Sequence, residues 1–330
     1  MAFVYGMGNP LMDIILSAGH EKVIELGVTP GSMNLVEFEF QKRVIGSCRL
    51  TSRLAGGSCS NTMRALGWLA GGETRIEPPV YSGAVGNDEY GSVFEESLRA
   101  EGVTPSLAWK ETPTGSSAII VTPDHERTMF TFLGACRDLT HADVDTSSLA
   151  GCSVFHTTGY MWDTENQEEA VKTAIMAVRA RGGLVSFDIA DPFVVDRYRA
   201  DLVKWLPGRI DVLFANEQEL MALTGVTSNR EAIVREAKRF APVVVMKIGR
   251  EGCMIGEDGN IATVPGETVA AQDTTGAGDS FAGGFLYGLV IGKDVAACGR
   301  LANRIAGYIV TVDGCHYRNL DRQKVLAALA

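Results

Sequence analysis

The stretch DTTGAGDSFAGGF, Asp273–Phe285, places a glycine-bearing turn directly before an apolar helical pattern. Gly276 and Gly278 flank Ala277, and glycines at such a turn let backbone N–H groups converge without interference from Cβ atoms. The helix adds unpaired N–H donors and a partial positive charge, so we expect an anion hole here. Asp279 lies in the first helical turn, where the helix terminus should keep its carboxylate ionised and weakly basic. This carboxylate could accept the proton of a hydroxyl that attacks a phosphoryl group, or it could merely complement the helix dipole.

The composition narrows the class of protein. The chain has 330 residues, of which 46% are hydrophobic, enough for one large domain. Its 30 basic and 40 acidic side chains give a net charge of −10, so nucleic acid and anionic membranes are not expected partners. Seven scattered cysteines without a C-x-x-C pair, and an N-terminus without a basic leader, favour a cytoplasmic protein.

Apolar runs rich in Val, Ile and Phe alternate with amphipathic helical patterns along most of the chain. This alternation predicts an α/β protein whose mostly parallel sheet is covered by helices on both faces. Ligands then bind at the carboxyl ends of the strands. The predicted strands are Phe3–Gly8, Ser153–Tyr160, Leu184–Ala190, Val212–Asn216 and Val243–Gly249, and helical patterns cover 165–183, 196–208 and 229–240.

Two regions interrupt this alternation and predict a small β-lid inserted into the main domain. Pro113–Gly134 reads as an antiparallel hairpin, and Gly27–Phe40 mixes turns with a strand-like run. We assign residues 15–49 and 109–135 to the lid, and 1–14, 50–108 and 136–330 to the large core of a single catalytic domain, 1–330. An exposed apolar face on such a lid would close over a substrate or pair with a second copy, so both a monomer and a homodimer through the lid stay open.

Two motifs in the first quarter of the chain suit a polar ligand. In GGSCSN, Gly56 and Gly57 allow close backbone approach, and the Asn61 amide could bind a sugar hydroxyl or cap a helix. In GNPLMDI, Asp13 interrupts an apolar run. A buried carboxylate needs several donors, which a pair of vicinal hydroxyls or local amides would supply.

Two further motifs suit phosphate and metal. In ANEQE, Asn216 and Glu219 lie three residues apart and share a face if a helix begins there. Their oxygens could serve a hydrated Mg²⁺, or Asn216 could simply cap the helix. Lys247, at the end of a predicted strand, could face a phosphate or be an ordinary surface lysine.

These motifs together resemble the ribokinase (PfkB) family of carbohydrate and nucleoside kinases. DTTGAGDSFAGGF is similar to its C-terminal signature, GGSCSN to its N-terminal signature and ANEQE to its Asn-x-x-Glu magnesium and phosphate motif, in the expected order. The resemblance covers essentially the whole chain and implies a ribokinase-like three-layer α/β/α fold with an inserted β-lid. Within the family, GNPLMDI and TPDHERTMFTFLGACRDL resemble the adenosine kinase branch.

The resemblance implies ATP-dependent transfer of the γ-phosphate to the 5′-hydroxyl of a nucleoside, with adenosine as the first candidate. Thr275 and the string DIADPF depart from adenosine kinases, so a kinase for ribose, fructose or a keto-acid sugar remains the alternative. A ligand-sensing protein that kept the fold and lost catalysis is the third hypothesis.

The resemblance also assigns residues. It implies catalytic roles for Asp279, Gly276, Ala277 and Gly278, acceptor binding by Asn9, Asp13, Gly56, Gly57, Asn61, Tyr160 and Phe193, and ATP binding near Asn216, Glu219, Lys247, Gly249, Thr275 and Asn303. The implied cofactors are ATP, Mg²⁺ held through water by Asn216 and Glu219, and a monovalent cation such as K⁺ near Asp273 and Thr275.

Overall fold

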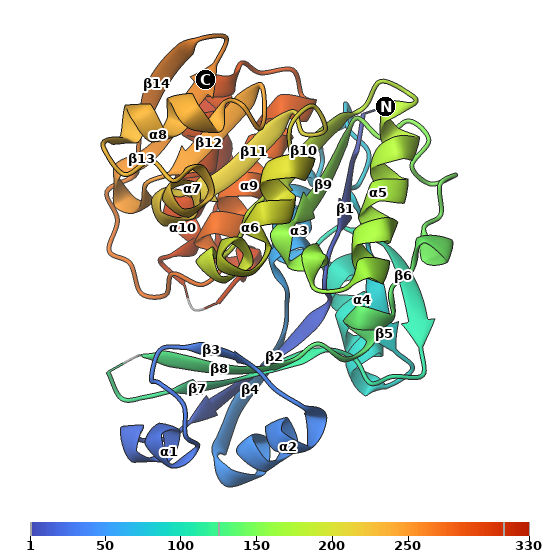
Figure 1. The fold of residues 1–330 in the computed structure, drawn as a ribbon, viewed down its shortest axis with the longest axis vertical. Helices are drawn as coiled ribbons and strands as arrows, with labels where there is room; N and C mark the ends of the chain where they lie inside the picture. Colours follow the sequence, from blue (N-terminus) through green and yellow to red (C-terminus); the bar gives the residue numbers. More distant parts are fainter. Residues whose placement is uncertain (1, 125, 313, 330) are drawn as a thin grey trace.

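A nine-stranded sheet forms the centre of the larger part of the molecule (Figure 1). The computed structural model describes residues 2–124, 126–312 and 314–329. The strand order is β14-β13-β12-β11-β10-β9-β1-β5-β6, and only the β12–β13 and β13–β14 pairs are antiparallel. The strands are β1 (Val4–Met7), β5 (Val80–Gly86), β6 (Thr104–Lys110), β9 (Val154–Thr158), β10 (Leu184–Asp188), β11 (Val212–Asn216), β12 (Val243–Lys247), β13 (Gly252–Glu257) and β14 (Asn260–Pro265).

Helices cover both faces of this sheet because successive strand residues point to opposite sides. In β11, Leu213 and Ala215 belong to the core beneath α5 to α8, whereas Val212 and Phe214 belong to the core beneath α3, α4, α9, α10 and α11. The predicted three-layer α/β/α fold is therefore confirmed (Figure 1). The helices are α3 (Ser58–Ala70), α4 (Glu89–Ala100), α5 (Glu165–Arg179), α6 (Pro192–Trp205), α7 (Glu217–Thr224), α8 (Arg230–Ala237), α9 (Ala277–Val290), α10 (Val295–Ile309) and α11 (Arg322–Leu326).

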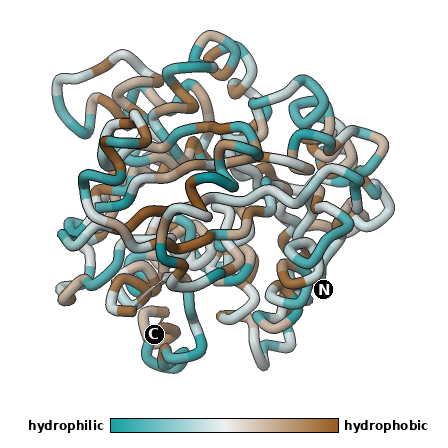
Figure 2. Tube along the Cα trace, turned by 90° about the horizontal axis from the view of Figure 1, so that it is seen from below, coloured by the Kyte–Doolittle hydropathy of each residue, from teal (hydrophilic) through white to brown (hydrophobic). Residues whose placement is uncertain are grey.

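Hydrophobic residues gather on the inner segments and hydrophilic residues on many outer loops, as Figure 2 shows. Within the described ranges, no helix combines the length and apolar character that crossing a membrane requires.

A second, five-stranded sheet forms the lid, which lies below the large sheet in Figure 1. Its order is β3-β8-β7-β2-β4, and β7 and β8 are the antiparallel hairpin that the sequence predicts. The apolar residues of one face, among them Ile14 and Phe130, pack against Val23 of α1 and Val44 of α2. That face is thus covered by helices of the same chain. The elements are β2 (Leu11–Ser17), α1 (His20–Glu25), β3 (Met33–Leu35), α2 (Phe38–Ser47), β4 (Arg49–Gly56), β7 (Ser116–Val121) and β8 (Arg127–Phe132).

The lid differs in extent from the sequence-based boundaries. β2 begins at Leu11 and β4 ends at Gly56, so residues 11–14 and 50–56 belong to the small sheet, whereas the predicted ranges gave them to the core. Residues 109 and 110 pair within the large sheet as the end of β6. The predicted boundaries were drawn around two regions that interrupt the alternation of strands and helices. That pattern does not show where the chain leaves the large sheet, because β2 begins only a few residues after β1 ends. The lid also contains two helices, which the term β-lid did not anticipate.

Candidate active site

The turn before α9 has a backbone shape that requires glycine. Gly276 is the N-cap of α9 with φ 68°, and a methyl group there would overlap the Sγ of Cys315. The N–H of Ala277 donates to the carbonyl of Thr274 at 3.2 Å. Among the described residues, none accepts a hydrogen bond from the N–H groups of Gly278 or Asp279. The N–H groups of Gly278 and Asp279 are therefore free to bind an anion.

Two side chains of α3 hold the Asp279 carboxylate. Ser58 Oγ donates to Oδ1 at 2.6 Å, and Asn61 Nδ2 donates to Oδ2 at 2.9 Å. Burial nevertheless raises the pKa of Asp279, assisted by the nearby Asp188 charge and opposed by these hydrogen bonds and by Lys247. The expectation that the helix terminus makes Asp279 weakly basic is wrong, because desolvation outweighs the donors. A raised pKa makes this carboxylate a better proton acceptor near neutral pH.

Two cavities meet at the turn. The first cavity, of about 340 Å³, lies between the lid and the carboxyl edge of the large sheet. The second cavity, of about 300 Å³, is lined by Ala277 and Gly278, whereas Gly276 and Asp279 line the first. The turn thus contributes to both walls, with the carboxylate on the side of the first cavity. The predicted residues Asn9, Asp13, Gly57, Tyr160 and Phe193 line the first cavity, and Lys247, Gly249 and Asn303 line the second.

Asp13 reaches the first cavity from β2 of the lid. No described residue donates a hydrogen bond to its carboxylate, which lies directly against the backbone of Gly56. Burial raises the pKa of Asp13 to about 7, although Arg127 and Arg64 lower it in part. A desolvated carboxylate without protein donors is set to accept hydrogen bonds from a ligand.

The two predicted asparagines of this region have partners within the protein. Asn9 Oδ1 accepts from Gln167 Nε2 at 2.7 Å, and Asn9 Nδ2 donates to the Tyr160 carbonyl at 3.4 Å. Asn61 is buried beneath Asp279 and is absent from the residues lining the first cavity. The structure thus gives Asn61 a role in orienting Asp279, where the sequence suggested a contact with a sugar hydroxyl.

Asn216 and Glu219 form the capping box of α7. Asn216 Oδ1 accepts from the Glu219 N–H at 2.8 Å, and the Glu219 carboxylate accepts from Asn216 N at 2.8 Å and Nδ2 at 2.6 Å. Burial raises the pKa of Glu219 to about 7, opposed by Lys247 and increased by Asp188. Neither capping residue lines the two cavities. The carboxylate keeps lone pairs for a water molecule, so the pair fits Mg²⁺ through water and not as direct ligands.

Asp273 and Thr275 do not fit a monovalent cation. The Asp273 carboxylate accepts from Thr275 N (2.9 Å), Thr275 Oγ1 (2.6 Å), Gly314 N (2.9 Å) and the Arg127 guanidinium (2.9 Å). These donors and the Arg127 charge hold the pKa of Asp273 below its ordinary value although burial opposes them. A carboxylate that is already saturated, with an arginine beside it, offers little to a second cation. Because Arg127 belongs to β8, this pair also ties the lid to the loop before the turn.

Three side chains that the sequence did not indicate also lie in this region: Ser58, Arg127 and Asp188. Ser58 lies inside the GGSCSN motif, and its position at the start of α3 was the available signal. Asp188 pairs with Lys247 at 2.7 Å, and their side chains are 3% and 14% exposed. Lys247 is therefore not an ordinary surface lysine.

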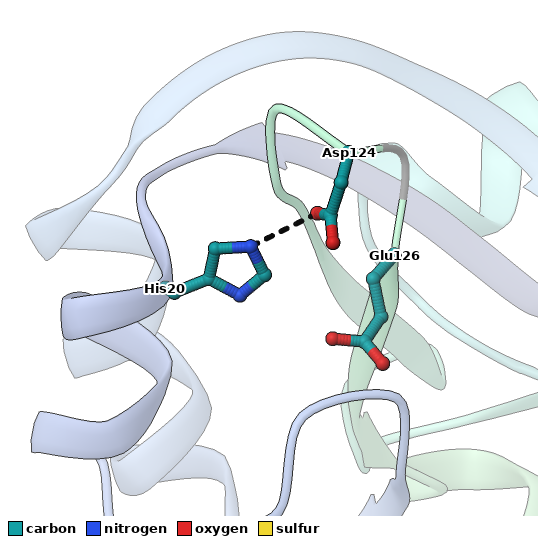
Figure 3. Close-up of side chains that lie close together, drawn as sticks. All are labelled: His20, Asp124 and Glu126. Atoms are coloured by element: carbon teal, nitrogen blue, oxygen red, sulfur yellow. Dashed lines mark ion pairs between the residues drawn. The ribbon is translucent and has the colours of Figure 1, made fainter.

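Among the described residues, one cluster of metal-ligating residue types lies on the lid (Figure 3). None of its residues lines either of the two cavities. One ligand atom each from His20, Asp124 and Glu126 lie within 4.8 Å of one another. His20 Nε2 and Asp124 Oδ1 already pair at 3.0 Å, and both side chains are largely exposed. We interpret this cluster as a surface ion pair of the lid.

Comparison with known proteins shows the family to which the chain belongs. The model of the pfkB family carbohydrate kinases matches residues 29–322, and the chain belongs to this family. It is therefore a kinase, a phosphotransferase with an alcohol group as acceptor.

Some of the similar proteins are named sugar kinases and others are named adenosine kinases. An uncharacterised sugar kinase of Archaeoglobus fulgidus is 30% identical over 231 residues, which are 68% of this chain and 88% of that protein. The crystal structure of adenosine kinase from Sinorhizobium meliloti is similar with a TM-score of 0.89 and 29% identity, over 99% of both chains. A probable sugar kinase from Rhizobium etli has a TM-score of 0.90 and 30% identity, also over 99% of both chains.

Proposed function

We propose that this chain is an ATP-dependent nucleoside kinase that phosphorylates the 5′-hydroxyl of adenosine or a close analogue. The observation that carries the proposal is the turn that separates two cavities, with Asp279 facing the first and the Gly278 backbone facing the second. This arrangement suits an acceptor alcohol on one side and a phosphoryl donor on the other.

The chemistry follows from these positions. Asp279 accepts the proton of the attacking hydroxyl while Ser58 and Asn61 hold the carboxylate in place. The free N–H groups of Gly278 and Asp279 stabilise the charge that spreads over the transferred phosphoryl group. The lid lines the first cavity through Asp13 and excludes water that would otherwise hydrolyse ATP.

ATP is proposed to occupy the second cavity beside Lys247, Gly249 and Asn303. Asn303 Nδ2 donates to the carbonyls of Val264 and Pro265 at 3.0 Å each, which fixes its amide at the cavity wall. Mg²⁺ bound to the phosphates would neutralise their charge, with Asn216 and Glu219 holding its water ligands.

The lining of the first cavity favours a neutral acceptor with an apolar group. Met33, Met129 and Phe193 supply apolar surface that suits a base better than a free sugar. Four carboxylates, those of Asp13, Asp163, Asp191 and Asp279, line the cavity together with no basic side chain among the described residues. A keto-acid sugar would meet repulsion there. Two relatives named as sugar kinases keep ribose and fructose as the second candidates.

Expected partners are small molecules only, and a cytoplasmic location stays a prediction. Assembly as a monomer or as a homodimer through the lid also stays a prediction. Since α1 and α2 cover one apolar face of the lid, a dimer through the lid sheet would have to use its opposite face or one of its edge strands, β3 and β4. Sedimentation equilibrium would decide between the two states.

A panel of acceptors tests the proposed function. Adenosine, other nucleosides, ribose, fructose and a keto-acid sugar are each supplied with ATP and Mg²⁺, and ADP release is coupled to a spectroscopic signal. We expect adenosine to give the highest kcat/KM. Turnover of a sugar without turnover of any nucleoside would reject the nucleoside assignment and leave the kinase. If no acceptor increases ADP release but calorimetry detects nucleoside binding, the protein would be a ligand sensor.

A further inference from the structure

A buried ion pair joins the ends of two strands of the large sheet. Asp188 ends β10 and Lys247 ends β12, and the lysine side chain reaches across the end of β11, which lies between them. Lys247 Nζ lies 2.7 Å from Asp188 Oδ2 and 3.0 Å from Oδ1, so the ammonium contacts both carboxylate oxygens. Such a contact restrains the lysine far more than a single exposed pair would.

Asp188 is also connected to the wall of the first cavity. Its Oδ1 accepts a hydrogen bond from the N–H of Ala190 at 3.1 Å. Ala190 has φ 72°, a left-handed conformation that is unfavourable for alanine and needs support from its surroundings. Ala190, Asp191 and Phe193 line the first cavity. The carboxylate that holds Lys247 thus also holds the loop on the acceptor side.

Lys247 lies at the other side of the turn. It lines the second cavity, and a methyl group added at Gly278 would lie 3.4 Å from its Nζ. The ammonium is therefore beside a free N–H donor of the turn, where a phosphoryl group would be bound.

More than one carboxylate acts on the Lys247 ammonium. Asp188 of β10, Glu219 of α7 and Asp279 of α9 all act on Lys247, and the buried His156 of β9 stays neutral because burial lowers its pKa to about 4. Burial disfavours the lysine charge, but the three carboxylates outweigh this and raise the pKa of Lys247. The ammonium therefore stays protonated over the working pH range.

We propose that Asp188 is a positioning residue that holds the Lys247 ammonium at the anion-binding turn, and that Lys247 contacts the transferred γ-phosphoryl group. The Asp188 carboxylate thereby links the loop at Ala190, which lines the first cavity, to the side of the turn where the phosphoryl group would be bound. The inference rests on the proposed location of ATP in the second cavity but is independent of which alcohol is the acceptor. No proton leaves the lysine, which contributes charge and position only.

Asp188→Asn is the central test, because the amide keeps the shape of the side chain and removes its charge. We expect kcat to fall about 10- to 100-fold while the acceptor KM changes less than about threefold. The alkaline limb of the kcat–pH profile should move to lower pH, since Lys247 loses a group that raises its pKa. Lys247→Met should lower kcat at least as much, and the double variant should be no slower than Lys247→Met alone.

Asp143→Asn is the matched control. Asp143 pairs with Lys110 at 2.8 Å in a half-buried site that lines neither cavity, so its loss should lower Tm without changing kcat or the pH profile. Circular dichroism establishes that each variant is folded. If Asp188→Asn does not fold, the double variant Asp188→Leu/Lys247→Met, which removes both charges, takes its place.

A folded variant of Asp188 with kcat within twofold of wild type and an unchanged alkaline limb would overturn the proposal and leave a structural ion pair. Slow turnover with the shifted limb supports it for any acceptor, including a sugar. If instead the wild-type protein lacks ATP-dependent turnover of every alcohol, the proposed function fails, and this outcome is distinct because it precedes any comparison of variants.

Discussion

Replacing Asp13 by asparagine should stabilise the ligand-free protein and weaken acceptor binding. The Asp13 carboxylate has no hydrogen-bond donor among the described residues, and its pKa is raised to about 7 by burial. An acid whose pKa is raised on folding destabilises the native state when it is ionised, so this cost appears as the pH rises and is absent at low pH. Asparagine removes the charge and with it the cost.

The size of the effect follows from the pKa. A rise from 3.8 to about 7 corresponds to at most about 4 kcal/mol at pH 8, where Asp13 is ionised in both states. The side chain keeps some contact with the cavity, so we expect about 2 to 4 kcal/mol. For a chain of 330 residues this amounts to a Tm about 3 to 6 °C higher for Asp13→Asn. An amide accepts hydrogen bonds from two hydroxyl groups of the acceptor more weakly than the Asp13 carboxylate does. The acceptor KM should therefore rise about 30- to 100-fold.

The assay is thermal unfolding at pH 8 and pH 5 without ligand, together with steady-state kinetics at pH 8. The Tm gain should be smaller at pH 5, where wild-type Asp13 is protonated in the folded state. Asp258→Asn serves as the control because Asp258 is exposed in the turn between β13 and β14 and changes the net charge equally. A Tm that is unchanged or lower at pH 8 would refute the desolvation argument. An unchanged acceptor KM would refute the hydroxyl contact.

Three further predictions concern the turn. Asp279→Asn should lower kcat by about 10²- to 10⁴-fold in stopped-flow or coupled assays, with an unchanged circular dichroism spectrum, because the general base is lost. Ser58→Ala removes a donor that lowers the pKa of Asp279, so the acid limb of the kcat/KM–pH profile should move to higher pH, whereas a limb at lower pH would contradict the assignment. Gly276→Ala should reduce both Tm and kcat because its φ is 68° and a methyl group would overlap Cys315. Gly259→Ala, also at positive φ but with open space around it, should reduce Tm slightly and leave kcat unchanged.

The architecture was predictable because it rests on local patterns. Runs such as Val212–Asn216 and Val243–Gly249 carry the composition of buried parallel strands, and each of the five predicted core strands contains an observed one. The hairpin within Pro113–Gly134 was visible for the same reason. The lid boundaries were not, since β2 and β4 extend between the two parts without a change in composition.

Some features of the candidate site could likewise be predicted from the sequence, and others could not. The turn at Gly276 and the capping box at Asn216 are formed by residues a few positions apart, so the sequence indicated where they lie. It could not tell that Asn61 supports Asp279, because these residues are 218 positions apart and meet only through the packing of α3 on α9.

The sequence by itself indicated the alternation of strands and helices in the core, the glycine turn before α9 and the carboxylate that follows it. Each of these depends on backbone conformations and burial patterns within a short stretch of chain. Only the tertiary structure decided which charges meet: Asp188 with Lys247, and Arg127 with Asp273. Pairing energies act over a few ångströms in space, and side chains far apart in sequence come that close only when the strands are arranged side by side.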